Sequence, residues 1–154
     1  SMWFRVDNRL IHGQVIEGWL PYTGAAHLIV ANDALAEDLL RQQIMSLAIP
    51  HHVDVRFVPL KDLAGTLKEC GDESFVLFEN LQDVRTAARS GVTLNVLNIG
   101  NLHYGAGKKQ LCTHVAVSED DMAALRELVS GQGTELDFRA VPLEPEKIPD
   151  EFVL

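Results

Sequence analysis

The chain has 154 residues, of which 47% are hydrophobic and 23% charged, enough to bury a sizeable core within one domain. Its formal net charge of −9 argues against nucleic-acid binding and against a protein held on anionic lipid, since both use broad positive surfaces. Cys70 and Cys112 are too few and too separated for a disulfide framework, and no stretch approaches the roughly 20 apolar residues of a membrane span. Without a signal-peptide pattern, we expect a cytoplasmic protein whose residues 1–154 form a single domain.

Short runs rich in β-branched and aromatic residues predict strands along the whole chain. In chain order they are 3–6, 27–31, 53–58, 75–78, 94–99, 115–117 and 136–141. Several are apolar almost without interruption, which is typical of parallel strands covered on both faces.

Amphipathic stretches between these runs predict helices. In chain order they are 14–19, 35–48, 60–69, 81–90 and 119–129. The apolar stripe of the second stretch, expected to face the core, consists of Leu35, Leu39, Leu40, Ile44 and Leu47. Glycines following three of the helical runs, predicted as C-terminal caps, are Gly71, Gly91 and Gly131.

The alternation of strands and helices predicts an α/β fold: a single doubly wound domain with a mostly parallel central sheet flanked by helices on both faces. In such folds ligands bind beyond the carboxyl ends of the strands. The loops that follow predicted strands at this edge are 7–13, 31–34, 79–81 and 100–109.

The first of these loops concentrates polar chemistry around His12. Arg9 precedes the histidine, Gly13 follows it, and a helix starting near Gln14 would point its first N–H groups toward an anion beside the ring. A neutral imidazole can attack a phosphoryl group, and arginine and amide donors stabilise the charge that spreads over its oxygens. The loop is therefore compatible with the needs of a histidine phosphocarrier.

The segment 5–15, RVDNRLIHGQV, resembles the active-site signature of the mannose/fructose/sorbose family of enzyme IIB components of the phosphoenolpyruvate-dependent sugar phosphotransferase system. The matched residues are Arg5, Asp7, Arg9, Leu10, Ile11, His12, Gly13, Gln14 and Val15. Weaker similarity continues through 29–33, 77–80, 98–100, 107–108 and 115–120. The sequence departs from the family pattern at Leu81, at Asn101 and over 102–105, which bears on partner and sugar specificity.

The resemblance implies that His12 accepts a phosphoryl group on Nδ1 from a IIA phosphohistidine and passes it to a sugar bound by the IIC and IID membrane components. This activity, that of a protein-phosphohistidine–sugar phosphotransferase, needs neither a metal nor an organic cofactor. The protein would be cytoplasmic and peripheral to the membrane permease. The predicted phosphate-binding residues are Arg9, Gly13, Gln14 and Arg5, and the predicted supporting residues are Asp7 and Asn8.

Plainer interpretations stay open for several residues. Arg5 could pair with Asp7 instead of binding phosphate, and Arg9 could form a surface salt bridge. The stretch 100–108 fails as a P-loop, since Leu102 takes the place of the first glycine. Adjacent His51 and His52 point apart on an extended segment, so no metal site is predicted.

Two rival functions also stay open. One is a regulator whose partner senses the phosphorylation state of His12, and the other is an anion-binding domain that is never phosphorylated. The sequence leaves open which sugar is used, the roles of His103 and Lys108, and the oligomeric state, for which a homodimer is favoured.

Overall fold

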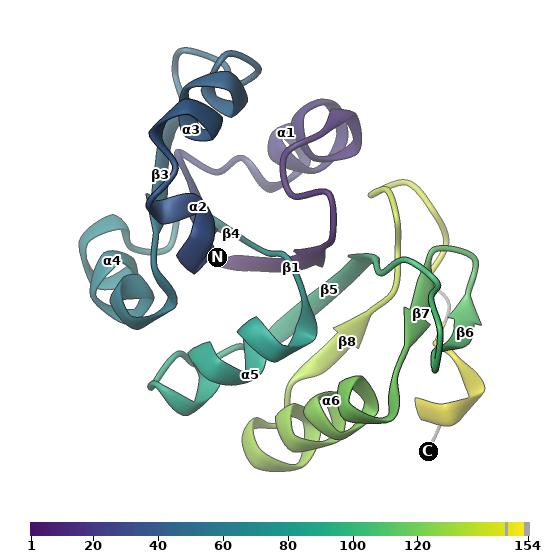
Figure 1. The fold of residues 1–154 in the computed structure, drawn as a ribbon. Coiled ribbons are helices and arrows are strands. Elements are labelled where there is room, and N and C mark those ends of the chain that lie inside the picture. Colours follow the sequence, from purple (N-terminus) through teal and green to yellow (C-terminus); the bar gives the residue numbers. More distant parts are fainter. Residues whose placement is uncertain (147, 153–154) are drawn as a thin grey trace.

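The computed structural model describes residues 1–146 and 148–152. Its centre is a sheet of six parallel strands in the order β3-β2-β4-β1-β5-β8 (Figure 1). The strands are β1 (Trp3–Asp7), β2 (His27–Ala31), β3 (Asp54–Val58), β4 (Ser74–Phe78), β5 (Val96–Asn101) and β8 (Glu135–Asp137). The predicted parallel sheet is confirmed, and it places β1 between β4 and β5.

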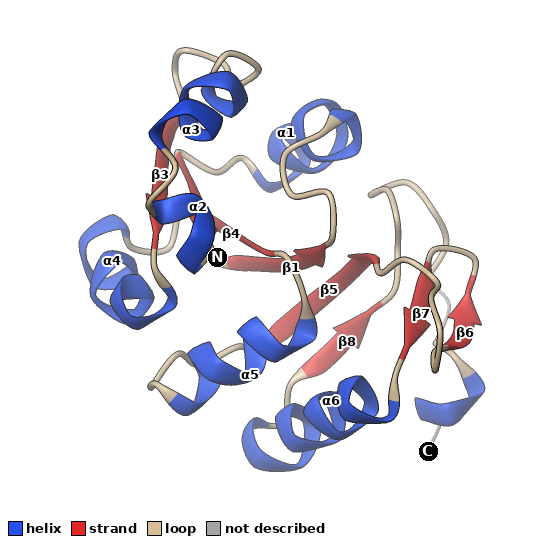
Figure 2. Ribbon diagram, in the orientation of Figure 1, coloured by secondary structure: helices blue, strands red, loops and turns tan. Residues whose placement is uncertain are grey.

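Helices cover both faces of this sheet, as predicted (Figure 2). One face carries the π-helical turn η1 (Gln14–Trp19), α1 (Leu20–Thr23), α2 (Asp33–Ala36) and α3 (Leu39–Ser46). The other carries the 3₁₀ turn η2 (Leu60–Asp62), α4 (Leu63–Cys70), α5 (Leu81–Arg89) and α6 (Glu119–Gln132). A short 3₁₀ turn, η3 (Asp150–Phe152), lies near the C-terminus.

The core divides into two apolar clusters because successive strand side chains point to opposite faces. In β2, Leu28 and Val30 pack with Trp19 in one cluster, whereas Ile29 and Ala31 belong to the other. All four strand residues are fully buried. The uninterrupted apolar run of β2 therefore serves two faces at once, which is the physical reason that the sequence shows no polar alternation there.

The predicted core-facing stripe of 35–48 is wrong beyond its first residue. The chain breaks after α2, and Asp38 starts a new helix by accepting a hydrogen bond from the Arg41 amide at 3.1 Å. Leu35 of α2 is buried, whereas the later residues of the stripe face outward. These side chains, 59 to 87% exposed, are Leu39, Leu40, Ile44 and Leu47.

Other differences concern the C-terminal half. The predicted strand 115–117 exists as β7 (Val115–Val117), but it pairs antiparallel with β6 (Lys109–Cys112), which the sequence did not predict. The helix predicted over 119–129 continues through Gly131, and Gly133 caps it with a left-handed φ of 69°. Among the described residues, no helix combines the length and apolar character needed to cross a bilayer.

Candidate active site

The loop after β1 begins at Asp7, whose backbone and side chain both shape it. The Leu10 amide donates to the Asp7 carbonyl at 3.0 Å, and the Arg9 amide donates to Asp7 Oδ1 at 2.8 Å. Leu10 has a φ of 55°, a left-handed conformation that is costly for leucine, and its side chain is buried. A tight, strained turn anchored in the core thus presents the residues that follow it.

The second oxygen of the Asp7 carboxylate, Oδ2, is the centre of the site. It lies 2.6 Å from His12 Nε2 and accepts hydrogen bonds from Arg5 Nη2 at 3.0 Å and Asn101 Nδ2 at 2.9 Å. Burial alone would raise the pKa of Asp7, but these hydrogen bonds and the charge of Arg5 outweigh it and lower the pKa below its ordinary value. Asp7 is therefore ionised at neutral pH.

An ionised Asp7 fixes the tautomer of His12. A carboxylate can only accept, so Nε2 of the imidazole carries the proton and donates it, and the lone pair of the neutral ring resides on Nδ1. Within the described part of the chain, no group hydrogen-bonds to Nδ1 and the atom is covered. The His12 side chain is 7% exposed. The site thus orients the ring with a nucleophilic nitrogen directed away from Asp7.

Arg5 is fully buried behind the carboxylate. Its guanidinium donates to Asp7 and to Asn98 Oδ1, and its Cζ lies 5.3 Å from the centre of the Trp19 ring. It packs so closely on the backbone of β5 that a Cβ on Gly100 would overlap it. The structure therefore shows the pairing with Asp7 that the sequence left open for Arg5, and not a side chain facing solvent.

The other predicted residues line the same edge of the sheet. The Asn8 side chain donates to the Glu79 carbonyl at 2.7 Å and accepts from the His103 amide at 2.8 Å, so it connects the loops after β4 and β5. Gln14 Oε1 accepts from Asn101 Nδ2 at 2.9 Å. Arg9 and Gly13, which precede and follow His12 in the loop, are both exposed.

Two residues of the network were not among the predicted site residues. Asn98 and Asn101 come from β5, and both join the hydrogen-bond network around Arg5 and Asp7. The sequence did contain a sign of their role, because two asparagines interrupt an otherwise apolar strand there. Gly100 in the same strand also indicates that other atoms approach the backbone closely. Assigning them required knowledge that β5 lies beside β1.

Lys108 and Lys109 lie away from this network. Lys108 Nζ donates to the His103 carbonyl at 3.3 Å, and Lys109 forms an ion pair with Glu151 at 2.9 Å. Both also line a cavity of about 590 Å³ together with Met122 of α6. None of the residues that line this cavity belongs to the loop of His12.

Comparison with known proteins assigns the family. The model of the family described as PTS system sorbose subfamily IIB component matches residues 2–153. The N-acetylgalactosamine-specific phosphotransferase enzyme IIB component 2 of Escherichia coli K12 is 36% identical over 92% of this chain and 90% of its own. The sorbose-specific EIIB component of Klebsiella pneumoniae is 38% identical over 92% of this chain and 87% of its own.

Solved structures agree with the sequence comparison. The N-acetylgalactosamine IIB component of Streptococcus pyogenes superposes with a TM-score of 0.91 and 26% identity, covering 99% of this chain and 98% of that one. The IIB domain of the Klebsiella pneumoniae sorbose permease gives a TM-score of 0.85 and 34% identity, covering 96% and 92%. The predicted fold class and phosphotransferase activity are thereby confirmed. The chain belongs to the sorbose subfamily of IIB components of the sugar phosphotransferase system, the family that the signature at 5–15 predicted.

Proposed function

We propose that His12 receives a phosphoryl group on Nδ1 from the phosphohistidine of a IIA partner and passes it to a sugar during uptake. The observation that carries this proposal is the 2.6 Å contact between Asp7 Oδ2 and His12 Nε2. It reserves Nε2 for the carboxylate and leaves the lone pair of the ring on Nδ1.

The contact also serves the chemistry of each transfer. When Nδ1 attacks phosphorus, the P–N bond of the donor breaks as a new P–N bond forms, and the ring of His12 becomes positively charged. Asp7 stabilises that charge through Nε2–H. In the second transfer, a sugar hydroxyl forms the P–O bond and gives its proton to a base beside the sugar. His12 then leaves as a neutral imidazole that still holds its Nε2 proton.

Arg9 and the amides that begin the following helix would bind the phosphoryl oxygens. Arg9 is exposed and three residues from His12, and exposed Gly13 leaves space for a docking protein. Arg5 acts in this proposal as a positioning residue for Asp7, because it is fully buried and bonded to that carboxylate.

The covered position of Nδ1 sets a requirement for this mechanism. Because the atom is buried in the structure, docking of a partner must shift the loop of residues 9–13 or turn the ring to admit phosphorus. The same cover would protect the P–N bond from water between the two transfers.

The partners follow from the family. A mannose-specific EIIAB component of Escherichia coli K12 is 32% identical over 92% of this chain, which spans 44% of that protein, and its name joins a IIA to a IIB part. This supports a IIA partner for the present chain. We further propose that the sugar receives the phosphoryl group at IIC and IID membrane components. In this proposal, residues 1–154 act as one cytoplasmic IIB domain that binds the permease peripherally and forms a homodimer.

Labelling by a phosphorylated IIA protein tests the site. Wild-type protein should gain acid-labile phosphate, His12→Ala should gain none, and Arg9→Ala should be labelled about a hundredfold more slowly, because a donor to the transferring group is lost. His103→Ala is the matched control, since it removes an exposed histidine from the neighbouring loop and should be labelled like the wild type.

Full labelling of His12→Ala would rule out the assigned nucleophile. An unlabelled wild type in the presence of several competent IIA donors would instead favour the passive anion-binding domain. NMR of the labelled imidazole distinguishes Nδ1 from Nε2, and phosphate on Nε2 would contradict the role given to Asp7.

A further inference from the structure

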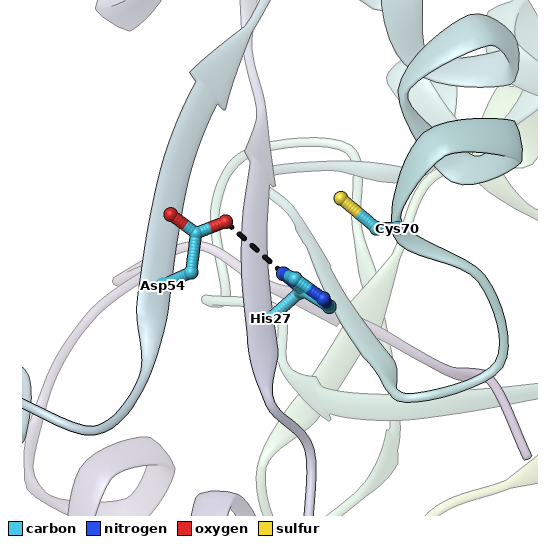
Figure 3. A group of neighbouring side chains, drawn as sticks. All are labelled: His27, Asp54 and Cys70. Carbon is cyan, nitrogen blue, oxygen red and sulfur yellow. Dashed lines mark hydrogen bonds and ion pairs between the residues drawn. The ribbon is translucent and has the colours of Figure 1, made fainter.

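A second group of reactive side chains lies at the opposite edge of the sheet from His12. His27 is the first residue of β2, Asp54 is the first residue of β3, and the two are paired in register. Cys70 ends α4, which packs on the neighbouring face. Figure 3 shows the three side chains turned toward one another from these three elements. The strands are parallel, so this cluster at their amino ends is remote from the phosphocarrier loop.

The geometry of the cluster is that of a ligand set. One ring nitrogen of His27, a carboxylate oxygen of Asp54 and Sγ of Cys70 all lie within 4.8 Å of one another. His27 Nδ1 is 3.0 Å from Asp54 Oδ2. An imidazole nitrogen, a carboxylate oxygen and a thiolate together are the donors that Zn²⁺ takes in proteins, at distances of about 2.0 to 2.3 Å. Small side-chain rotations would bring the three atoms around one ion.

We propose that His27, Asp54 and Cys70 form a zinc site with three protein ligands and a water molecule in the fourth position. The cluster is reachable from solvent, because Asp54 is exposed and His27 and Cys70 are half-buried. Binding replaces the hydrogen bond between His27 and Asp54, leaves the imidazole proton on the ring nitrogen that does not bind the metal, and releases the thiol proton of Cys70 to water.

Arg56 is the competitor of the ion at this site. Its Nε donates to Asp54 Oδ2 at 3.0 Å, while its Nη1 donates to Glu69 Oε2 at 2.8 Å. The guanidinium thus pairs one positive charge with the Asp54 carboxylate, whereas Zn²⁺ would bring two. The positive charge of Arg56 beside Asp54 opposes the binding of a cation there, and Glu69 can retain the arginine if Zn²⁺ displaces it. Removal of this competing charge should therefore tighten metal binding.

The site would tie α4 to the β2–β3 strand pair, adding metal–ligand bonds to the strand hydrogen bonds and to the Arg56–Glu69 ion pair. A metal bound across β2, β3 and α4 binds the folded state and not the unfolded chain, so it raises the melting temperature in a manner that depends on metal concentration. This role is independent of the proposed phosphoryl transfer.

Titration of the full chain with Co²⁺ and Zn²⁺ tests the proposal. Co²⁺ should produce the charge-transfer absorption of a cobalt–thiolate bond in the wild type, and Zn²⁺ should abolish it by competition. Cys70→Ser and His27→Gln should bind Zn²⁺ at least about tenfold more weakly and lose the metal-dependent rise in melting temperature. Arg56→Gln should bind more tightly than the wild type.

Matched controls identify the site within the chain. Cys112→Ser removes the other free cysteine and should retain the absorption band, as should His12→Ala. Equal binding by Cys70→Ser and Cys112→Ser would overturn the proposal, as would a wild type without the band. Loss of the band in His12→Ala would place the metal at the phosphocarrier loop instead.

Discussion

Replacing Gly100 with alanine tests whether the buried Arg5 guanidinium holds the active-site carboxylate in place. Gly100 lies in β5 outside the left-handed region, so its backbone accepts alanine. The added Cβ would overlap Arg5 Cζ and both terminal guanidinium nitrogens. Arg5 must then move, and its hydrogen bonds to Asp7 at 3.0 and 3.2 Å and to Asn98 must break.

The expected cost follows from the burial of both charges. Breaking a buried ion pair while leaving its members inside costs about 3–5 kcal/mol. Because small domains have free energies of unfolding of about 5–15 kcal/mol, the loss should be plain in urea denaturation, with the midpoint lowered and the slope unchanged. Gly65→Ala in α4 is the control: nothing lies within 4 Å of its new Cβ, and it should stabilise by about 0.5–1 kcal/mol.

A double-mutant cycle isolates the clash itself. In an Arg5→Ala background the guanidinium is absent, so Gly100→Ala should cost less than about 1 kcal/mol there. The same loss of 3–5 kcal/mol in both backgrounds would refute the reasoning, since the cost would then arise from the strand backbone.

Two further predictions concern stability away from His12. Burial raises the pKa of Asp83 to about 6, with added repulsion from Glu79 and Asp33. The protonated carboxyl therefore stabilises the folded state fully below pH 4, and this stabilisation is lost as the pH rises through 6. After allowance for partial exposure, Asp83→Asn should stabilise by about 1–2 kcal/mol at pH 7.5 and negligibly at pH 4 in urea titrations, and an equal effect at both pH values would contradict this account. Leu47→Gln, at the exposed C-cap of α3, should change the free energy of unfolding by less than about 0.5 kcal/mol, whereas buried Leu35→Ala should cost about 2–5 kcal/mol. Similar losses for the two would place the end of α3 against the core after all.

The sequence predicted the centre of the sheet well because β1, β2 and β4 are buried on both faces. The run 27–31 coincides with β2, and the parallel arrangement followed from such apolar runs. The stripe of 35–48 failed for a local reason: Asp38 begins a new helix, and side-chain periodicity does not reveal where a helix restarts. Periodicity reports which residues share a side of a helix and not whether the core lies on that side.

The contacts around Asp7 were predictable where they are contiguous in sequence. His12 and the Arg9 amide, which both contact Asp7, fall within one loop, whereas Asn98 and Asn101 reach it only because β5 pairs with β1. The same limit hid the cluster of His27, Asp54 and Cys70, whose members meet through strand register and the end of a helix. Sequence spacing predicts neighbours within a loop, but strand order decides which distant polar residues share an edge.

The position of β1 between β4 and β5 also has a consequence for synthesis. Asp7 leaves the ribosome 94 residues before its partner Asn101, an interval of roughly 5–20 seconds at ordinary translation rates. Throughout that time Arg5 and Asp7 remain hydrated, since the amides that receive them have not been made. A nascent chain that already contains the histidine motif therefore lacks the hydrogen bonds that hold Asp7 and Arg5 from β5, and these form only after the fifth strand is made.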